Sequence, residues 1–350
     1  MPTSLLLLFL QAATILNLSW QSRASLPIPA AGGYYATLKG KIVYAGGSTW
    51  ENGVKRFLTE THVYDPATDR WSAGPKLPKP LAYGAFAHTH RGLEILGGTD
   101  SDRSSHECWV LESATANWKK CSGDPGDTLL ASAQAVGEEV VVFGGCPNLT
   151  ELARCSTTVR VKDASGRWSV IGEMPQGKVS IGASAALGGS VYLFGGVSGA
   201  AGEAIENHAD AYRFSLRDRQ WKQLRSLPRA ARGMTAVAWD GRYILLAGGY
   251  VTSQAEAAGK PPDFGFTGDL LVYDTVTDVS KRGGLDPPLG RLGSPTGGRG
   301  LVRDGRRGKD AVPLRAGGPR QNGAGPISVT KVPYTSSKCA IKTDLIVQST

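Results

Sequence analysis

Short apolar runs that end in a glycine doublet recur along the chain at a near-constant interval. A tryptophan precedes the first glycine of each doublet by 26 or 27 residues, so the pattern defines five units of about 50 residues. A fixed period of this size is typical of propeller blades or solenoid repeats. The five runs are KIVYAGG (41–47), LEILGG (93–98), VVVFGG (140–145), VYLFGG (191–196) and YILLAGG (243–249).

A second pattern lies between each doublet and the next tryptophan. Two short apolar segments flank a polar turn, with Asp-Pro in HVYDPATDRW (62–71) and Ser-Gly in TVRVKDASGRW (158–168). Turn residues between apolar segments predict a hairpin. Each unit therefore predicts four antiparallel strands. Because one such sheet cannot bury both of its faces alone, we expect the units to pack radially into a propeller.

The order of apolar-Gly-Gly, Tyr-Asp-Pro, Trp and Leu-Pro resembles the kelch repeat, whose fold is a β-propeller. The resemblance covers about residues 20 to 279 in five linked copies. It implies an all-β, kelch-type propeller, and we expect six four-stranded blades with a degraded sixth blade. An N-terminal strand at Trp20 would supply the outer strand of that last blade and close the ring.

The two ends of the chain differ from the repeat. A short apolar run from Leu5 to Leu10 is too brief to span a bilayer and predicts a secretory signal peptide over residues 1–13, with export to the periplasm or outside the cell. Blades are expected over residues 14–280. A Gly/Arg-rich irregular segment over 281–330 takes the place of the sixth blade's core, and a C-terminal strand or tail occupies 331–350.

Five cysteines fit an oxidising compartment. Cys108 and Cys121 are opposed across a predicted hairpin, near enough for a cross-strand bond. Cys146 and Cys155 bracket the loop after the third doublet. The fifth cysteine, Cys339, has no predicted partner. Both pairs are candidate disulfides, with buried free thiols as the alternative, because sequence does not determine connectivity. The cysteine and histidine spacings match no zinc site, so no metal is expected.

Candidate ligand contacts lie in loops that a four-stranded blade brings to one side. The loops between the second and third strands and the loops between successive blades share this side, which we name the loop face. Arginine matches a carboxylate, and tryptophan and tyrosine offer flat surfaces to a sugar ring. Each residue could equally be a solvated loop residue. The candidates for substrate binding are Arg232, Arg103, Trp50, Asp102, Tyr83 and Arg229.

A narrower resemblance is carried by AGGSTWENGVKRF (45–57), LPKPLAYG (77–84), LGGTDSDR (96–103) and DLLVYDTVTD (269–278). These segments resemble the bacterial kelch proteins similar to N-acetylneuraminate epimerase, the sialic acid mutarotases. The resemblance implies interconversion of sugar anomers without a cofactor. An arginine would hold the carboxylate, for which Arg232 and Arg103 are expected. An acidic residue would assist proton transfer, and Glu51 is the candidate catalytic residue.

The residues after the doublets depart from that family. The mutarotase pattern places a glutamate directly after a doublet, followed six residues later by arginine. The catalytic pair is therefore not carried over to this chain, whose doublets are followed by Ser48, Thr99, Cys146, Val197 and Tyr250.

The last part of the chain is strongly basic. Residues 281–320 contain ten Lys or Arg against three Asp, and residues 321–350 add three Lys against Asp344, which together account for the net charge of +9. Three interpretations compete: a tail for a phosphate-rich partner such as nucleic acid, a solvated linker, or a misread coding frame. The lack of aromatics among these arginines before Tyr334 weighs against nucleic acid.

Three function classes follow. The first is an exported sugar mutarotase or epimerase that acts on an acidic sugar. The second is a non-catalytic kelch scaffold that binds a protein or a glycan. The third is a copper enzyme resembling galactose oxidase, which ranks last because the His and Tyr positions do not gather in the loops. Oligomeric state does not follow from the sequence.

Overall fold

The computed structural model describes residues 17–101, 103–175, 182–198, 206–251, 265–282, 284–286, 327–331 and 345–348. Within these ranges the chain consists of β-strands and one short 3-10 helix, η1 (Leu152–Arg154). The described residues include no helix with the length and apolar character needed to cross a bilayer. The predicted signal peptide, residues 1–13, lies outside these ranges.

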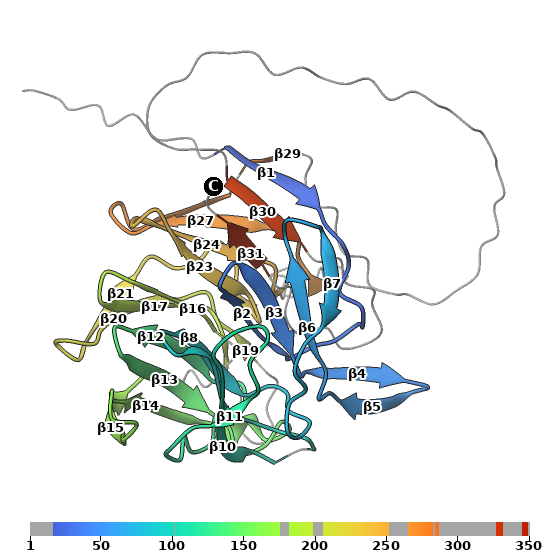
Figure 1. Cartoon of the computed structure of the whole chain (residues 1–350). Helices are drawn as coiled ribbons and strands as arrows, with labels where there is room; N and C mark the ends of the chain where they lie inside the picture. The colour runs from blue at the N-terminus through green and yellow to red at the C-terminus, as the bar shows by residue number, and fades with distance from the viewer. Residues whose placement is uncertain are drawn as a thin grey trace, which may run out of the picture.

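Five antiparallel four-stranded sheets follow one another along the described part of the chain (Figure 1), as the repeat predicts. In each sheet the strands pair in the order in which they occur. Blade 1 holds β2 (Tyr34–Leu38), β3 (Lys41–Ala45), β6 (Thr61–Asp65) and β7 (Arg70–Ala73); blade 2 holds β8 (Ala85–Thr89), β9 (Gly92–Gly98), β10 (Ser105–Leu111) and β11 (Lys119–Lys120); blade 3 holds β12 (Ser132–Val136), β13 (Glu139–Gly145), β14 (Ser156–Lys162) and β15 (Trp168–Glu173); blade 4 holds β16 (Ala183–Leu187), β17 (Ser190–Phe194), β20 (Ala211–Ser215) and β21 (Gln220–Leu224); blade 5 holds β23 (Thr235–Trp239), β24 (Tyr243–Ala247), β27 (Leu270–Asp274) and β28 (Val279–Arg282).

Smaller sheets form within the loops of the loop face. They are the hairpin β4 (Ser48–Glu51) and β5 (Val54–Phe57), the pair β18 (Val197–Ser198) and β19 (Glu206–Asn207), and the three-stranded sheet of β22 (Ala231–Arg232), β25 (Tyr250–Val251) and β26 (Gly265–Phe266). Backbone bridges join the residue after a doublet to the connection that enters the same blade, as in Ala31 with Ser48 and Ala82 with Thr99. These bridges bring both kinds of loop to one face, as expected.

The glycine doublets pack against the connection to the next blade. Gly46 and Gly47 both have positive φ, +63° and +93°. A Cβ atom on Gly46 would lie 2.4 Å from the carbonyl oxygen of Leu81, whereas Gly47 donates its N–H to that same oxygen at 2.8 Å. Only glycine allows this combination of backbone conformation and close approach, which explains the recurrence of the doublet.

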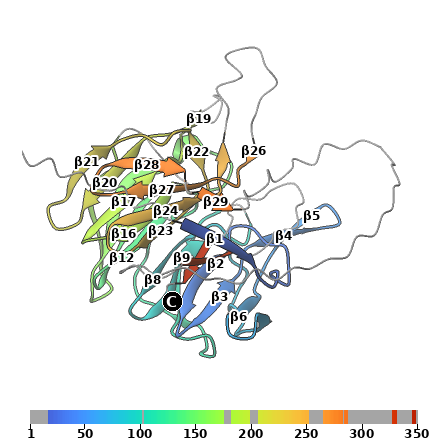
Figure 2. The same ribbon diagram turned by 90° about the horizontal axis from the view of Figure 1, so that it is seen from above.

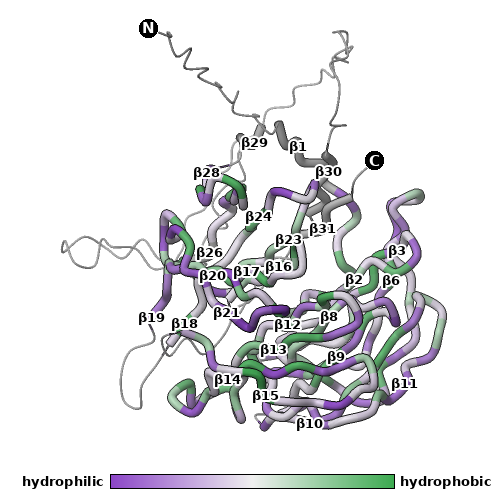
Figure 3. Tube along the Cα trace, turned by 90° about the vertical axis from the view of Figure 1, so that its left-hand side faces the viewer, coloured by the Kyte–Doolittle hydropathy of each residue, from purple (hydrophilic) through white to green (hydrophobic). Residues whose placement is uncertain are grey.

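Side-chain size changes from the axis outward. All five inner strands contain the small residue alanine, which suits the place where they converge in the described part of the chain. The second strands β9 and β13 are almost wholly buried and carry Leu, Ile, Val and Phe. Figure 3 shows apolar segments along the strands and hydrophilic segments in the turns around them. The core is therefore continuous across neighbouring blades rather than central to each sheet.

In three blades a tryptophan of the repeat joins the blade to the connection before it. The indole N–H of Trp71 donates to the carbonyl of Ala24 at 2.9 Å, that of Trp118 to Pro75 at 2.9 Å, and that of Trp221 to Glu173 at 2.9 Å. Each acceptor lies four or five residues after the preceding tryptophan of the repeat. The constant spacing of the tryptophans thus sets the blade-to-blade contact.

An aspartate in the turn before the outer strand completes this contact in two blades. Asp69 accepts the backbone N–H of Ala24 at 2.8 Å and the hydroxyl of Tyr64 at 2.7 Å. Asp278 accepts the N–H of Arg225 at 3.0 Å and the hydroxyl of Tyr273 in the same way.

A further four-stranded sheet combines both ends of the chain. Its order is β29 (Gly284–Asp286), β1 (Asn17–Ser22), β30 (Ile327–Lys331) and β31 (Leu345–Gln348), and β1 pairs in parallel with both neighbours. The N-terminal strand thus lies inside its sheet and not at the outer edge that we expected. The physical reason is that the chain after β28 has no tryptophan, and its glycine doublets do not end an apolar run of the kind that defines an antiparallel blade. β29 and most of β30 fall in the segment predicted to be irregular, and β31 is the C-terminal strand.

Replacing Trp71 by Phe should lower the free energy of unfolding by about 0.5–1.5 kcal/mol, because the Ala24 carbonyl loses the indole donor of a part-buried hydrogen bond. Urea unfolding followed by tryptophan fluorescence and circular dichroism measures the change. Trp168→Phe is the matched control, since the indole nitrogen of Trp168 is buried with no hydrogen-bond partner among the described residues. An equal loss in both variants would contradict the role of the inter-blade hydrogen bond.

Candidate functional site

A cavity of about 300 Å3 lies between the inner strands of the five blades. It is lined by residues of β2, β8, β12, β16 and β23 and by the residues just before them. Figure 2 shows the course of these five strands. Aromatic rings of Tyr35 and Phe86, the amide of Gln134 and the hydroxyl of Ser184 face it, while its described lining contains no Asp, Glu, Lys or Arg. Such a lining suits an uncharged group with both apolar and hydrogen-bonding surfaces.

Polar side chains in the cavity wall also join blades. Gln134 donates its side-chain N–H to the backbone oxygen of Ser184 at 2.8 Å, and Ser132 donates to the Gly182 carbonyl at 2.7 Å. Tyr35 and Thr235 form a hydroxyl–hydroxyl bond although they are 200 residues apart. Because these bonds cross between inner strands of different blades, the cavity wall is held by the same groups that face a ligand.

Tyr83 stands at the cavity in a strained backbone conformation. Its φ is +62°, and the equivalent positions before the other inner strands are Gly32 at +67°, Leu130 at +60° and Gly233 at +64°. A bulky residue in the left-handed region costs about 1–3 kcal/mol, and such strain clusters at functional sites. The Tyr83 ring lies so close to Gly32 that a Cβ there would be 2.4 Å from the ring.

The hairpin β4–β5 extends beyond the blades (Figures 1 and 2) and holds the other side of Tyr83. Its two-residue turn, Asn52-Gly53, has positive φ at both positions, as a type I′ turn requires. The hydroxyls of Ser48 and Tyr83 form a hydrogen bond of 2.7 Å, and Lys55 Nζ lies 4.5 Å from the centre of the Tyr83 ring. The hairpin therefore delivers a cation to the aromatic residue at the cavity.

The pairing register separates two predicted site residues. Trp50 pairs with Lys55, and Glu51 pairs with Val54, so Trp50 and Lys55 share one face of the hairpin and Glu51 lies on the other. Trp50 is 40% exposed. Glu51 accepts a hydrogen bond of 2.9 Å from Arg56, which also contacts Glu60. The structure thus brings Trp50 and Tyr83 to one side and directs Glu51 away from them.

Arg232 forms a second cation–aromatic pair on the loop face. Its guanidinium lies 4.6 Å from the centre of the Tyr250 ring and donates to Asn207 Oδ1 at 2.8 Å. Asn207 in turn donates to the Tyr250 carbonyl at 3.3 Å. Burial lowers the pKa of Arg232, and within the described ranges no carboxylate forms an ion pair with it. Arg232 directly precedes Gly233 and lies two residues before the cavity residue Met234 in the chain.

The remaining predicted contacts are not gathered at the cavity. Arg229 forms an ion pair with Asp269 on the loop face. Arg103 has an exposed side chain, and its backbone bridges to Asn148 in the next blade's loop. Asp102 lies outside the described residues. Of the six predicted contacts, Tyr83 is the one among the described lining residues of the cavity.

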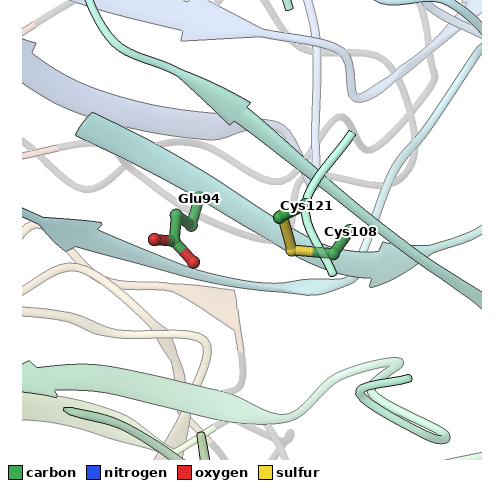
Figure 4. Close-up of side chains that lie close together, drawn as sticks. All are labelled: Glu94, Cys108 and Cys121. Atoms are coloured by element: carbon green, nitrogen blue, oxygen red, sulfur yellow. A yellow bond between two sulfur atoms is a disulfide. The ribbon is translucent and has the colours of Figure 1, made fainter. Parts of the chain in front are cut away.

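Both predicted cysteine pairs are disulfide-bonded, Cys108 to Cys121 and Cys146 to Cys155. The second bond closes the loop that packs near Tyr83 and Leu130. Figure 4 shows Glu94 beside the first bond. This trio is a poor metal site, because the sulfur atoms are bonded to each other and the Glu94 carboxylate is paired with Lys162 and Thr89.

Sequence reasoning missed three residues of this site. Asn207, Tyr250 and Ser48 position the cations or Tyr83, yet each is an ordinary loop residue in the sequence. One signal was available, because Ser48 and Tyr250 directly follow a glycine doublet, which the repeat places near the axis.

Comparisons with known proteins agree with this geometry. The kelch motif model matches residues 182–228, which span blade 4. N-acetylneuraminate epimerases are 30% identical over 157 residues in Yersinia enterocolitica (37% of this chain, 40% of the relative) and 27% identical over 160 residues in Haemophilus influenzae strain 86-028NP (39% and 43%). The solved structure of YjhT has a TM-score of 0.63 at 14% identity, covering 74% of this chain and 86% of that one.

The chain is an all-β, kelch-type β-propeller. Among curated proteins it resembles the N-acetylneuraminate epimerases, of which the matched segments cover less than half the length. The likeness to YjhT concerns the fold.

His106 on the loop face provides a test of the local electrostatics. Its Nε2 lies 3.0 Å from Asp127 and its Nδ1 lies 3.3 Å from Asp124. Burial lowers the pKa of His106, but the hydrogen bonds and charges of the two aspartates outweigh burial and raise the pKa above 6.5.

Since the folded-state pKa is raised, the stability that His106 contributes is complete below its unfolded pKa and is lost as the pH rises through the folded pKa. The difference in unfolding free energy between the wild type and His106→Gln should therefore shrink from about pH 5 to pH 8. Urea unfolding across this range measures it. A difference that grows with pH would contradict the ion pairs.

Proposed function

We propose that this propeller binds an acidic sugar of the N-acetylneuraminate type on its loop face. The observation that carries the proposal is the half-buried guanidinium of Arg232, which is held by Asn207 and Tyr250 and has no carboxylate partner among the described residues. A planar guanidinium in this setting suits a carboxylate, which would form charge-assisted hydrogen bonds. The curated relatives named N-acetylneuraminate epimerase support the choice of sugar.

Burial of Arg232 makes a carboxylate ligand favourable for a further reason. Desolvation lowers the pKa of this group, so its charged form is under-compensated in the free protein. A bound carboxylate would supply the missing opposite charge. The neighbouring cavity, with hydroxyl, amide and aromatic groups in its wall, suits the uncharged body of the sugar.

Anomer exchange is the finer proposal and rests on the relatives. Opening the sugar ring requires removal of a proton from the anomeric hydroxyl and donation of a proton to the ring oxygen. Glu51 keeps this predicted role, but its pairing with Arg56 and its place on the far face of the hairpin weaken the case. The absence of glutamate after the five doublets favours the second candidate, a propeller that binds the sugar without turnover.

Ring closure and export belong to the same proposal. We infer that the sheet β29-β1-β30-β31 takes the place of a sixth blade, because β31 lies against β23 and Trp71 joins blade 1 to the segment that follows β1. Two disulfides support an oxidising compartment, periplasmic or outside the cell. No cofactor is proposed.

Replacing Arg232 by Gln should weaken binding of N-acetylneuraminate at least about tenfold, because the charge-assisted bond to the carboxylate is lost. Isothermal titration calorimetry measures the affinity, and the melting temperature should stay near that of the wild type. Arg217→Gln, in an exposed turn at the opposite end of blade 4, is the matched control. Unchanged affinity in Arg232→Gln would remove this residue from the site.

Proton NMR of the pure α anomer, with and without protein, separates the two candidate functions. Faster approach to equilibrium would support an epimerase. Binding without acceleration would support the non-catalytic propeller.

A further inference from the structure

Two cation–aromatic pairs belong to the cavity region from different blades. Arg232 lies over Tyr250 and is two residues before the cavity residue Met234 in the chain, and Lys55 lies over Tyr83, which lines the same cavity. The first pair belongs to blade 5, while the second is formed by the hairpin of blade 1 with the connection into blade 2. A ligand long enough to reach from one pair to the other would meet both cations.

Lys55, like Arg232, lies over an aromatic ring and has no carboxylate partner in the described part of the chain, so it can bind an anion. Its Nζ lies 4.5 Å from the Tyr83 ring and 5.1 Å from the Phe57 ring, and in the part of the chain that the structure describes it forms no ion pair. Its neighbour Arg56, by contrast, is paired with Glu51 and Glu60 on the other face of the hairpin. One face of the hairpin therefore carries the ion-paired Arg56, and the other face, which we name the cationic face, carries Lys55.

The cationic face also carries an exposed aromatic ring. Trp50 pairs across the hairpin with Lys55 and is 40% exposed, so its ring and the ammonium group project on the same side. An exposed indole beside a cation suits a sugar ring that bears a carboxylate, since the indole covers the apolar side of the ring while the cation meets the charge. The strained, anchored Tyr83 lies at the inner end of this surface.

We propose that the ligand is an acidic oligosaccharide with at least two carboxylated sugars, one bound at Arg232 and the next at Lys55 and Trp50. This inference rests on the proposed function and extends it from a single sugar to a chain. The described lining of the cavity offers a carboxylate no Lys or Arg, so we assign the two carboxylates of the ligand to the two cations outside that lining. Binding of the first sugar makes binding of the second intramolecular, which raises the affinity without a new kind of contact.

Calorimetric titration of the full chain with N-acetylneuraminate and with its α2,8-linked dimer tests this proposal. The dimer should bind about tenfold or more tighter than the monosaccharide. Lys55→Gln should remove most of that gain and leave the affinity for the monosaccharide within about twofold of wild type, whereas Arg232→Gln should weaken both ligands. Lys39→Gln, in the exposed turn between β2 and β3 at the opposite end of blade 1, should change neither.

The outcomes separate the inference from the function on which it rests. Equal affinity for monomer and dimer, or a dimer advantage that survives in Lys55→Gln, would overturn the oligosaccharide site while leaving the acidic-sugar function intact. A dimer advantage lost in Trp50→Ala as well would support the stacked second ring. Failure of both sugars to bind a folded protein would overturn the proposed function and the inference together.

Discussion

The contact between neighbouring blades is the constraint on which the rest of this structure depends. A propeller sheet leaves one face uncovered unless a neighbouring sheet packs against it. In this repeat, neighbouring blades are joined by a hydrogen bond from a tryptophan side chain and not by backbone pairing between their strands. The indole of one blade donates to the carbonyl in the connection before it, and in two blades an aspartate accepts an N–H from the same kind of segment. Where this contact is present, it fixes a blade against the connection that precedes it.

Blade 5 shows where this constraint weakens. The residue paired with Tyr273, at the position that Trp71 and Trp221 occupy in their blades, is Ser280, whose hydroxyl is buried without a partner among the described residues. Asp278 retains its bond to Arg225. The loss of the indole coincides with the end of the repeat, after which strands from both ends of the chain form a mixed sheet of a different pattern.

The charges of the loop face fall into two groups. Most described cations there are neutralised locally, as in Arg229 with Asp269 and Arg154 with Glu151, and exposed pairs of this kind contribute little to stability. Lys55 and Arg232 instead lie over aromatic rings. A cation held over a ring is not neutralised by a carboxylate, which is why the proposed ligand contacts are assigned to these two groups.

The sequence alone determined the repeat, the four-stranded unit and the membership of the loop face, because each depends on local spacing and on turn chemistry. It named both cysteine pairs as candidates, and the structure showed that they are bonded. The sequence also identified Trp50, Tyr83 and Arg232 as loop residues of a suitable kind. Tertiary structure decided which of them share a surface. The hairpin register turned Glu51 away from Trp50, a contact with Gly32 anchored Tyr83, and Asn207 from another blade held Arg232. The contacts of Tyr83 with Gly32 and of Arg232 with Asn207 join residues that are distant in the chain, so no local sequence pattern predicts them.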